Sequence, residues 1–182
     1  MNEISITLHT SLTPALREVI GALYQEVRAP LLDHPNYRLD VFLDRLDRHG
    51  VETGFGVAIA HVRSTGSAVG YAYGNGIGPG DRWWRRMTST PPPRYATRDA
   101  VAIKEIGVIP DFRGTGVSRR MHDALLETRP EPHVTLMVNP AAGDGKVQKL
   151  YEGWGYAELG IVQPSPESPW LVCMGRAVRT PA

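Results

Sequence analysis

The stretch Ile103–Met121, IKEIGVIPDFRGTGVSRRM, decides how this chain folds. Its first residues form an apolar run that is typical of a buried strand, and its last residues begin a helix. The turn between them contains Gly114 and Gly116, which place no side chain over the backbone. The first N–H groups of a helix lack intrahelical partners and carry partial positive charge, so they bind phosphate wherever the approach is open. The stretch therefore predicts a phosphate-binding turn between a strand and a helix.

This turn does not match the two common nucleotide-binding loops. The dinucleotide pattern Gly-x-Gly-x-x-Gly fails because Arg119 stands at its third glycine. A second glycine-rich stretch, Gly143–Val147, lacks the earlier glycine of a P-loop and has Val147 where Ser or Thr is required. A nucleotide-binding switch is therefore a weaker hypothesis than a site for another phosphorylated ligand.

Hydrophobic periodicity places further elements on both sides of the turn. Apolar residues alternate in some segments and recur at helical spacing in others. The expected strands are residues 3–8, 55–62, 67–74, 100–108, 133–138, 156–162 and 170–177. The expected helices are residues 14–29, 39–50, 117–125 and 147–154. This order predicts a mixed α/β fold, with a central mixed, largely antiparallel sheet of about seven strands flanked by about four helices.

One long segment, Asn75–Thr97, interrupts this rhythm. It contains Trp83 and Trp84 as well as clusters of glycine and proline. Segments of this length without periodic structure are usually functional lids or disordered. We therefore interpret it as a long excursion from the sheet.

Length and charge limit the class of protein. The chain has 182 residues, which indicates a single domain over residues 1–182. Its 20 Lys and Arg against 19 Asp and Glu give a net charge of +1, which disfavours a nucleic-acid partner. Residues 82–129 nevertheless hold 10 Lys and Arg against 5 Asp and Glu. The positive segment contains the predicted turn, so the chain remains suited to one compact phosphorylated cofactor.

Cysteine, histidine and apolar runs exclude other classes. Cys173 is the only cysteine, so no intramolecular disulfide forms, and the 6 histidines never fall at zinc-ligand spacing. We expect no metal. The apolar runs are too short to cross a bilayer, and the first residues do not resemble a signal peptide. We therefore expect no membrane partner and a cytoplasmic location.

Two motifs resemble the GNAT superfamily of acyl-coenzyme A-dependent N-acetyltransferases. The family's Arg/Gln-x-x-Gly-x-Gly/Ala turn is matched by residues 113–118, with Ser118 at the final small position. The family's later Leu-Tyr-Glu-x-x-Gly-Phe corner is similar to residues 150–156, which read Leu-Tyr-Glu-Gly-Trp-Gly-Tyr. The family's Asn-x-x-Asn-x-x-Ala pattern is only partly present, because Asp144 stands near the place of the second Asn after Asn139.

The resemblance implies acetyl-coenzyme A as the acyl donor. It places backbone N–H groups of the turn on the pyrophosphate, with charge-assisted contacts from Arg113, Arg119 or Arg120. The alternative is an ordinary helix terminus with solvated arginines. The residues implied for coenzyme binding are Ile106, Gly107, Val108, Phe112, Arg113, Gly114, Thr115, Gly116, Val117, Ser118, Arg119 and Asn139.

The resemblance also assigns two catalytic positions. Glu105 stands where related proteins use an acid to accept the amine proton, directly or through water. A structural ion pair with Lys104 or a nearby arginine is the alternative for this residue. Tyr151 occupies the position of the general acid, because a phenol can protonate a thiolate while staying neutral at pH 7. Plain core packing is the alternative for Tyr151. A backbone N–H near Val108 is the expected oxyanion donor.

The acceptor is expected to be a primary amine. The excursion and the proline-rich link at residues 163–169 suggest a pocket, so a small molecule or amino acid derivative is favoured over a peptide or protein amine. Trp83, Trp84 and Tyr73 are the candidate acceptor contacts. We expect direct transfer in a ternary complex, and the resemblance makes a homodimer plausible. The alternative is a non-catalytic module that binds or senses acyl-coenzyme A on the same fold.

Overall fold

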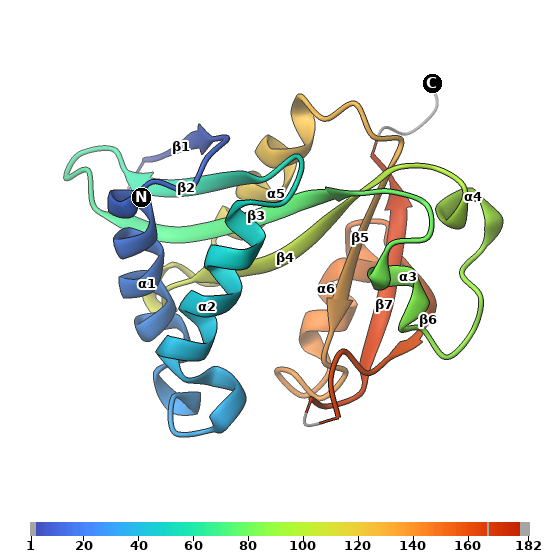
Figure 1. The fold of residues 1–182 in the computed structure, drawn as a ribbon. Coiled ribbons are helices and arrows are strands. Elements are labelled where there is room, and N and C mark those ends of the chain that lie inside the picture. Colours follow the sequence, from blue (N-terminus) through green and yellow to red (C-terminus); the bar gives the residue numbers. More distant parts are fainter. Residues whose placement is uncertain (1–2, 167, 179–182) are drawn as a thin grey trace. The chain divides into compact units, whose positions relative to one another are not determined.

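The computed structural model describes residues 3–166 and 168–178, and Figure 1 shows its elements coloured along the chain. One seven-stranded sheet has the order β1-β2-β3-β4-β5-β7-β6. Its strands are β1 (Ile4–His9), β2 (Gly56–Val62), β3 (Ala68–Ile77), β4 (Ala100–Val108), β5 (His133–Val138), β6 (Ala157–Val162) and β7 (Leu171–Ala177). The α-helices are α1 (Pro14–Arg28), α2 (Leu39–Gly50), α3 (Arg82–Arg85), α4 (Pro93–Ala96), α5 (Val117–Glu127) and α6 (Lys146–Gly153).

The predicted fold class is confirmed. β4 and β5 pair in parallel, whereas the pairs β1–β2, β2–β3, β5–β7 and β6–β7 are antiparallel. Helix ends follow the local signals: the Thr13 hydroxyl accepts a hydrogen bond from the Leu16 N–H at 3.2 Å, and Pro14 takes the first helical position of α1.

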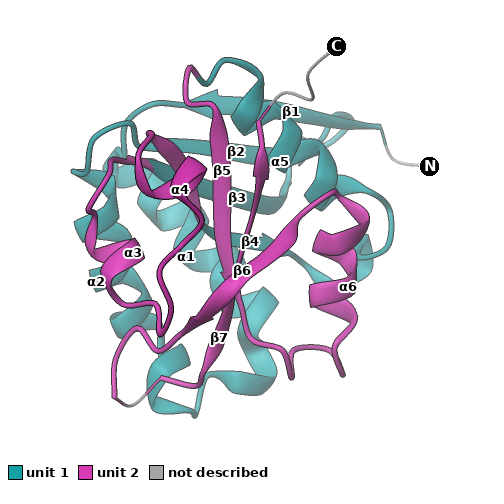
Figure 2. Ribbon diagram, turned by 90° about the vertical axis from the view of Figure 1, so that its right-hand side faces the viewer, with its two compact units in different colours: residues 1–75, 104–129 teal, residues 76–103, 130–182 magenta. Residues whose placement is uncertain are grey.

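The chain divides into two compact units, and Figure 2 colours them separately. Unit 1 consists of residues 1–75 and 104–129, and unit 2 of residues 76–103 and 130–182. Strand β4 contributes residues to both. The expectation of a single domain stays a prediction.

In unit 1, helices cover both faces of the strands. Residues from α1 and α2 form a core with alternate residues of β2 and β3: Leu16, Ile20, Leu23, Tyr24, Phe42, Leu46, Val57, Ile59, Tyr71 and Tyr73. Helix α5 contacts β1 and β2. A Cβ built on Gly56 would point at Leu125 and one on Gly70 at Met121, so α5 lies over the opposite face of these strands. Unit 1 therefore contains the end of β4 from Lys104 onward, the glycine turn and helix α5.

In unit 2, the parallel ladder runs from Ala100↔His133 to Ile103↔Leu136. Strand β5 continues beyond this ladder, pairing with β7 up to Val138. A second core is formed by Ile77, Trp83, Trp84, Tyr95, Ala100, Ala102, Leu159, Val162 and Cys173.

The segment Asn75–Thr97 contains more regular secondary structure than its sequence pattern predicts. It extends β3 to Ile77 and then forms two single-turn helices, α3 and α4. Trp83 and Trp84 are 9% and 4% exposed, because both rings pack into the core of unit 2. Burying these large rings stabilises the segment despite its glycines and prolines.

Candidate active site

The glycine turn leads directly from β4 into α5. After Val108 the chain makes one 3-10 turn at Pro110–Phe112, and Arg113 is extended. Gly114 and Gly116 then adopt φ values of 74° and 82°. This left-handed conformation costs a glycine little and most other residues considerably more. A Cβ built at either glycine meets no heavy atom within 4 Å, so the backbone here is open to a ligand.

The turn presents a row of unused backbone donors. The Phe112 and Arg113 N–H groups donate to Ile109 and Pro110 carbonyls at 3.0 and 3.1 Å. The next backbone bond along the chain runs from the Arg120 N–H to the Gly116 carbonyl, at 3.1 Å. Between them, the N–H groups of residues 114–118 donate to no other residue that the structure describes. Together with the positive end of the α5 dipole, these donors suit an anion.

The arginines around the turn have protein partners. The Arg113 guanidinium donates to the Val108 carbonyl at 3.2 Å and the Val27 carbonyl at 3.1 Å. It therefore ties the turn to the end of β4 and to the last turn of α1. Arg119 forms an ion pair with Asp123 at 2.7 Å, and Arg120 donates to the Ile4 carbonyl at 2.9 Å. Their expected phosphate contacts stay predictions.

The other predicted coenzyme residues of this region lie on β4 and at the start of α5. Gly107 and Val108 are buried and Ile106 is half-buried. A Cβ on Gly107 would lie 2.5 Å from Cε1 of the buried Tyr71 ring, so only glycine fits this position. The Thr115 hydroxyl donates to the Phe112 carbonyl at 2.6 Å, which tightens the turn. Val117 is buried and Ser118 is half-buried.

Glu105 forms an ion pair with a nearby arginine, as the alternative interpretation expected, although the sequence did not indicate which arginine. Its Oε1 lies 2.6 Å from Nη2 of Arg28, the last residue of α1. The two side chains are 14% and 30% exposed. Lys104, the other partner named in that alternative, lies 3.8 Å from Glu52. Glu105 is thus a half-buried carboxylate with one charged partner, two residues beyond the last β4–β5 pair.

Glu105 changes the titration of the groups around it. Its negative charge raises the pKa of Arg28 above the ordinary value. Burial, followed by the charge of Glu105, raises the pKa of Tyr24 to about 12 and that of Tyr71 well above its usual value. These tyrosines therefore stay neutral hydrogen-bonding groups over the whole physiological range.

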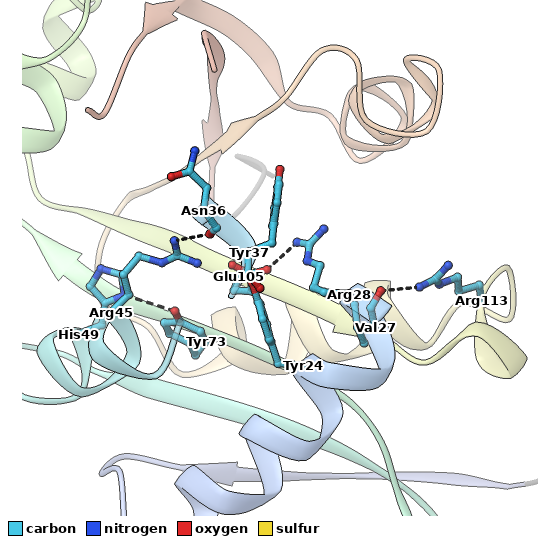
Figure 3. A network of polar contacts seen from close by, with 10 residues as sticks. All are labelled: Tyr24, Val27, Arg28, Asn36, Tyr37, Arg45, His49, Tyr73, Glu105 and Arg113. Atoms are coloured by element: carbon cyan, nitrogen blue, oxygen red, sulfur yellow. Dashed lines mark hydrogen bonds and ion pairs between the residues drawn. The ribbon is translucent and has the colours of Figure 1, made fainter. Parts of the chain in front are cut away.

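Figure 3 shows Glu105 within a group of polar side chains from α1, α2 and the segment between them. The Tyr24 hydroxyl donates to the Tyr37 carbonyl at 3.1 Å, and Arg45 donates to the Asn36 carbonyl at 3.3 Å. Arg28 lies over the Tyr37 ring, 5.5 Å from its centre. These contacts fix the two 3-10 turns that connect α1 to α2, Ala29–Leu31 and Pro35–Tyr37.

Tyr73, a candidate acceptor contact, belongs to the core of unit 1 and is 1% exposed. Its hydroxyl lies 3.3 Å from Nδ1 of His49. In unit 2, Nε1 of Trp83 donates to the Thr135 hydroxyl at 3.3 Å. Core packing accounts for Tyr73, Trp83 and Trp84 without a ligand, and their contact with an acceptor stays a prediction.

Tyr151 and Asn139 lie in unit 2. Tyr151, on α6, is half-buried, with its ring centre 5.3 Å from that of Trp154 and 5.8 Å from that of Tyr156. The Asn139 side-chain oxygen accepts from the Ala141 N–H at 2.9 Å, so it closes the turn that begins there. The catalytic role of Tyr151 and the coenzyme contact of Asn139 stay predictions.

Sequence reasoning missed Arg28 and Tyr37. An arginine in the last turn of a helix is common because it complements the helix dipole, so Arg28 carries no special signal. The turn-rich segment after α1 was visible as a break between two helices. Nothing local indicates that Arg28 pairs with a strand residue 77 positions away.

Among the described residues, no helix has the length and apolar character needed to cross a membrane. The same residues contain no group of three or more His, Cys, Asp or Glu side chains that could hold a metal ion.

No protein-family model and no curated protein matches the sequence, but solved structures share the fold. A GNAT-family acetyltransferase from Streptococcus agalactiae has a TM-score of 0.64 at 15% identity, covering 94% of this chain and 95% of that one. A GNAT-family acetyltransferase from Staphylococcus aureus has a TM-score of 0.64 at 13% identity, covering 96% and 100%. The ribosomal-protein-S18-alanine N-acetyltransferase from Escherichia coli has a TM-score of 0.59 at 15% identity, covering 98% and 97%.

The chain therefore has the fold of the GNAT-family acetyltransferases, as its motifs predicted. The proteins named above that share this fold are acetyltransferases.

Proposed function

We propose that this protein is an N-acetyltransferase that moves an acetyl group from acetyl-coenzyme A to a primary amine. The observation that carries the proposal is the row of unused N–H donors at residues 114–118, directly after the strand that holds Glu105. The donors suit the pyrophosphate of the coenzyme. The half-buried carboxylate suits removal of a proton from the acceptor amine.

The chemistry is a direct transfer in a ternary complex. The neutral amine nitrogen attacks the thioester carbonyl, so that a C–N bond forms and the C–S bond breaks. Glu105 accepts the amine proton, directly or through water. A backbone N–H near Val108 stabilises the tetrahedral oxyanion. Tyr151 gives its phenolic proton to the departing thiolate. Each role is part of the proposal.

A small amine is the proposed acceptor class, ahead of peptide or protein amines. Half-buried Glu105 lies beside the compact turns between α1 and α2, and polar contacts close these turns. A cytoplasmic location and a homodimer are part of the same proposal and rest on the sequence and on the family resemblance.

The test combines turnover and binding. Thiol release from acetyl-coenzyme A is measured with a panel of amines, and coenzyme A affinity is measured by calorimetry. Glu105→Gln and Tyr151→Phe are each expected to lower kcat by about 100-fold or more, because general acid–base groups contribute such factors. Both variants should keep the coenzyme affinity of the wild type.

Matched controls exist for both substitutions. Glu52→Gln alters a half-buried carboxylate paired with Lys104, and Tyr156→Phe alters the aromatic neighbour of Tyr151. Neither control should change turnover by more than about twofold. Coenzyme binding without thiol release from any amine would identify a sensing module instead. Displacement of coenzyme A by ATP or GTP at lower concentration would identify a nucleotide switch.

A further inference from the structure

The Arg28–Glu105 pair brings opposite charges together beside the turns between α1 and α2. The two interacting atoms lie 2.6 Å apart, and the side chains are mostly, but not fully, withdrawn from solvent. A pair in this position loses hydration on both groups, and that loss offsets much of its Coulomb attraction. A ligand that offers each group a charged hydrogen-bond partner therefore competes well with the pair itself.

Two buried donors next to the pair are unused. Nε of Arg28 and the hydroxyl of Tyr71 have no hydrogen-bond partner among the described residues. A buried donor without a partner costs free energy, which a ligand acceptor recovers on binding. The guanidinium presents Nε and Nη2 as parallel donors, and Glu105 uses only Nη2. Such a fork matches the two oxygens of a carboxylate.

Neighbouring residues hold Arg28 in a position from which it can bind a carboxylate. Its guanidinium lies over the Tyr37 ring, and Tyr24 fixes the Tyr37 backbone through its hydroxyl. The backbone of the preceding residue, Val27, is held by Arg113 of the glycine turn. Figure 3 shows these contacts around the end of α1. A guanidinium that is already positioned loses little conformational entropy when it binds an anion.

The charges of the pair are complementary to those of an α-amino acid, which carries an amine and a carboxylate on the same carbon. Glu105 and Arg28 likewise place an anionic and a cationic group side by side. An amino acid placed head to tail along the pair would present its amine to Glu105 and its carboxylate to the Arg28 fork. A peptide N-terminus has a neutral amide in place of that carboxylate.

We infer that the acceptor carries a carboxylate next to its reactive amine, as a free α-amino acid does, and that Arg28 binds this carboxylate. The inference rests on the proposed acetyl transfer, with Glu105 as the base. Arg28 is then the residue that determines specificity, and it distinguishes free amino acids from simple amines and from peptides.

The test compares matched acceptors. Thiol release is measured with each of the common amino acids, with its α-amide and with its decarboxylated amine, for example phenylalanine, phenylalaninamide and phenethylamine. For the best amino acid, kcat/KM is expected to exceed that of both analogues by about 10- to 100-fold. A factor of this size is what one charged hydrogen bond between the acceptor carboxylate and Arg28 would contribute. Arg28→Gln should remove this preference by lowering kcat/KM for the acid only.

Further variants separate specificity from folding. Arg28→Lys keeps the charge but loses the fork, so an intermediate preference is expected. Arg17→Gln, which breaks an exposed pair of α1 with Asp47, should leave the preference unchanged. Circular dichroism and coenzyme A affinity establish that each variant is folded.

The possible failures are distinguishable. Absence of thiol release with every amine would refute the proposed function. Turnover of the amides or simple amines at the rate of the acids, or an equal loss for both in Arg28→Gln, would leave the enzyme assignment intact and refute the role of Arg28.

Discussion

The glycine-rich turn before α5 lies in unit 1 and the one before α6 lies in unit 2, and the two turns use their backbone N–H groups differently. Gly116 and Gly145 are equivalent in position: both precede the helix, with φ values of 82° and 80°, and neither helix has a side-chain cap. In the second turn, however, the N–H groups of residues 144–146 donate to carbonyls three residues earlier. In the first turn, residues 114–118 donate to no described residue.

The comparison shows that glycine content alone does not indicate an anion site. Both stretches are glycine-rich in sequence, and both adopt left-handed glycine conformations. What differs is whether the backbone satisfies its own donors. The turn after β4 leaves them available, and the turn before α6 uses them to fold on itself.

The largest expected effect comes from a carboxylate placed in each turn. Gly116→Glu should raise the Kd of coenzyme A by at least about 100-fold, because a negative charge would stand against the pyrophosphate. Gly145→Glu imposes the same left-handed strain at the same helix position. Its Kd should stay within about threefold of the wild type. Calorimetric titration measures both, and equal losses in the two variants would remove the distinction between the turns.

A second comparison concerns the packing around two glycines, one on the strand before the first turn and one at the end of the helix after the second turn. Gly107→Ala should destabilise the protein by about 1 to 3 kcal/mol, because the new Cβ would overlap the buried Tyr71 ring. Gly153, in the last turn of α6, has no atom within 4 Å of a built Cβ. Gly153→Ala should be neutral or stabilise the protein by up to about 1 kcal/mol. Urea unfolding decides the signs, and a neutral Gly107→Ala would show that the strand is more plastic than described.

The smallest expected effect is a loss of stability at alkaline pH, caused by one buried titratable group in each unit. Burial raises the pKa of Cys173 in unit 2 from 9.0 to about 11. Burial and the charge of Glu105 raise the pKa of Tyr24 in unit 1 from 10.0 to about 12. The unfolded state loses each proton at a lower pH than the folded state does. Each group therefore makes its full contribution to the free energy of unfolding below its unfolded-state pKa, and this contribution is lost as the pH rises through the folded-state pKa.

A single substitution of each residue should separate the two pH ranges in which stability is lost. Tyr24→Phe removes a loss of stability between pH 10 and 12, and Cys173→Ala removes one between pH 9 and 11. Each is expected to be on the order of 1 kcal/mol. The free energy of unfolding, measured at several pH values, gives the difference between variant and wild type. A difference independent of pH would contradict the assignment.

Sequence patterns predicted the sheet, the four longer helices and the glycine turn, because each depends on local periodicity or on a cap such as Thr13. They did not predict the secondary structure within Asn75–Thr97. Its glycines and prolines indicate a loop, whereas tertiary burial of Trp84 and Tyr95 outweighs that preference.

The sequence indicated only part of the candidate site. Glu105 stands on a recognisable strand and was identified by its position. Its partner Arg28 is distant in sequence and lies at an ordinary helix end, so only the folded chain brings the two together. The sequence predicted available N–H donors in the turn after β4. It did not indicate that the turn before α6 uses its own donors, since that depends on the path of the backbone rather than on residue type.

The most direct test of the central claim is a titration of the isotope-labelled protein with coenzyme A, followed through its backbone amide resonances. We expect saturable binding, with the largest chemical-shift changes at residues 114–118. Saturable binding with its largest changes at residues 141–146, or no saturable binding, would contradict it.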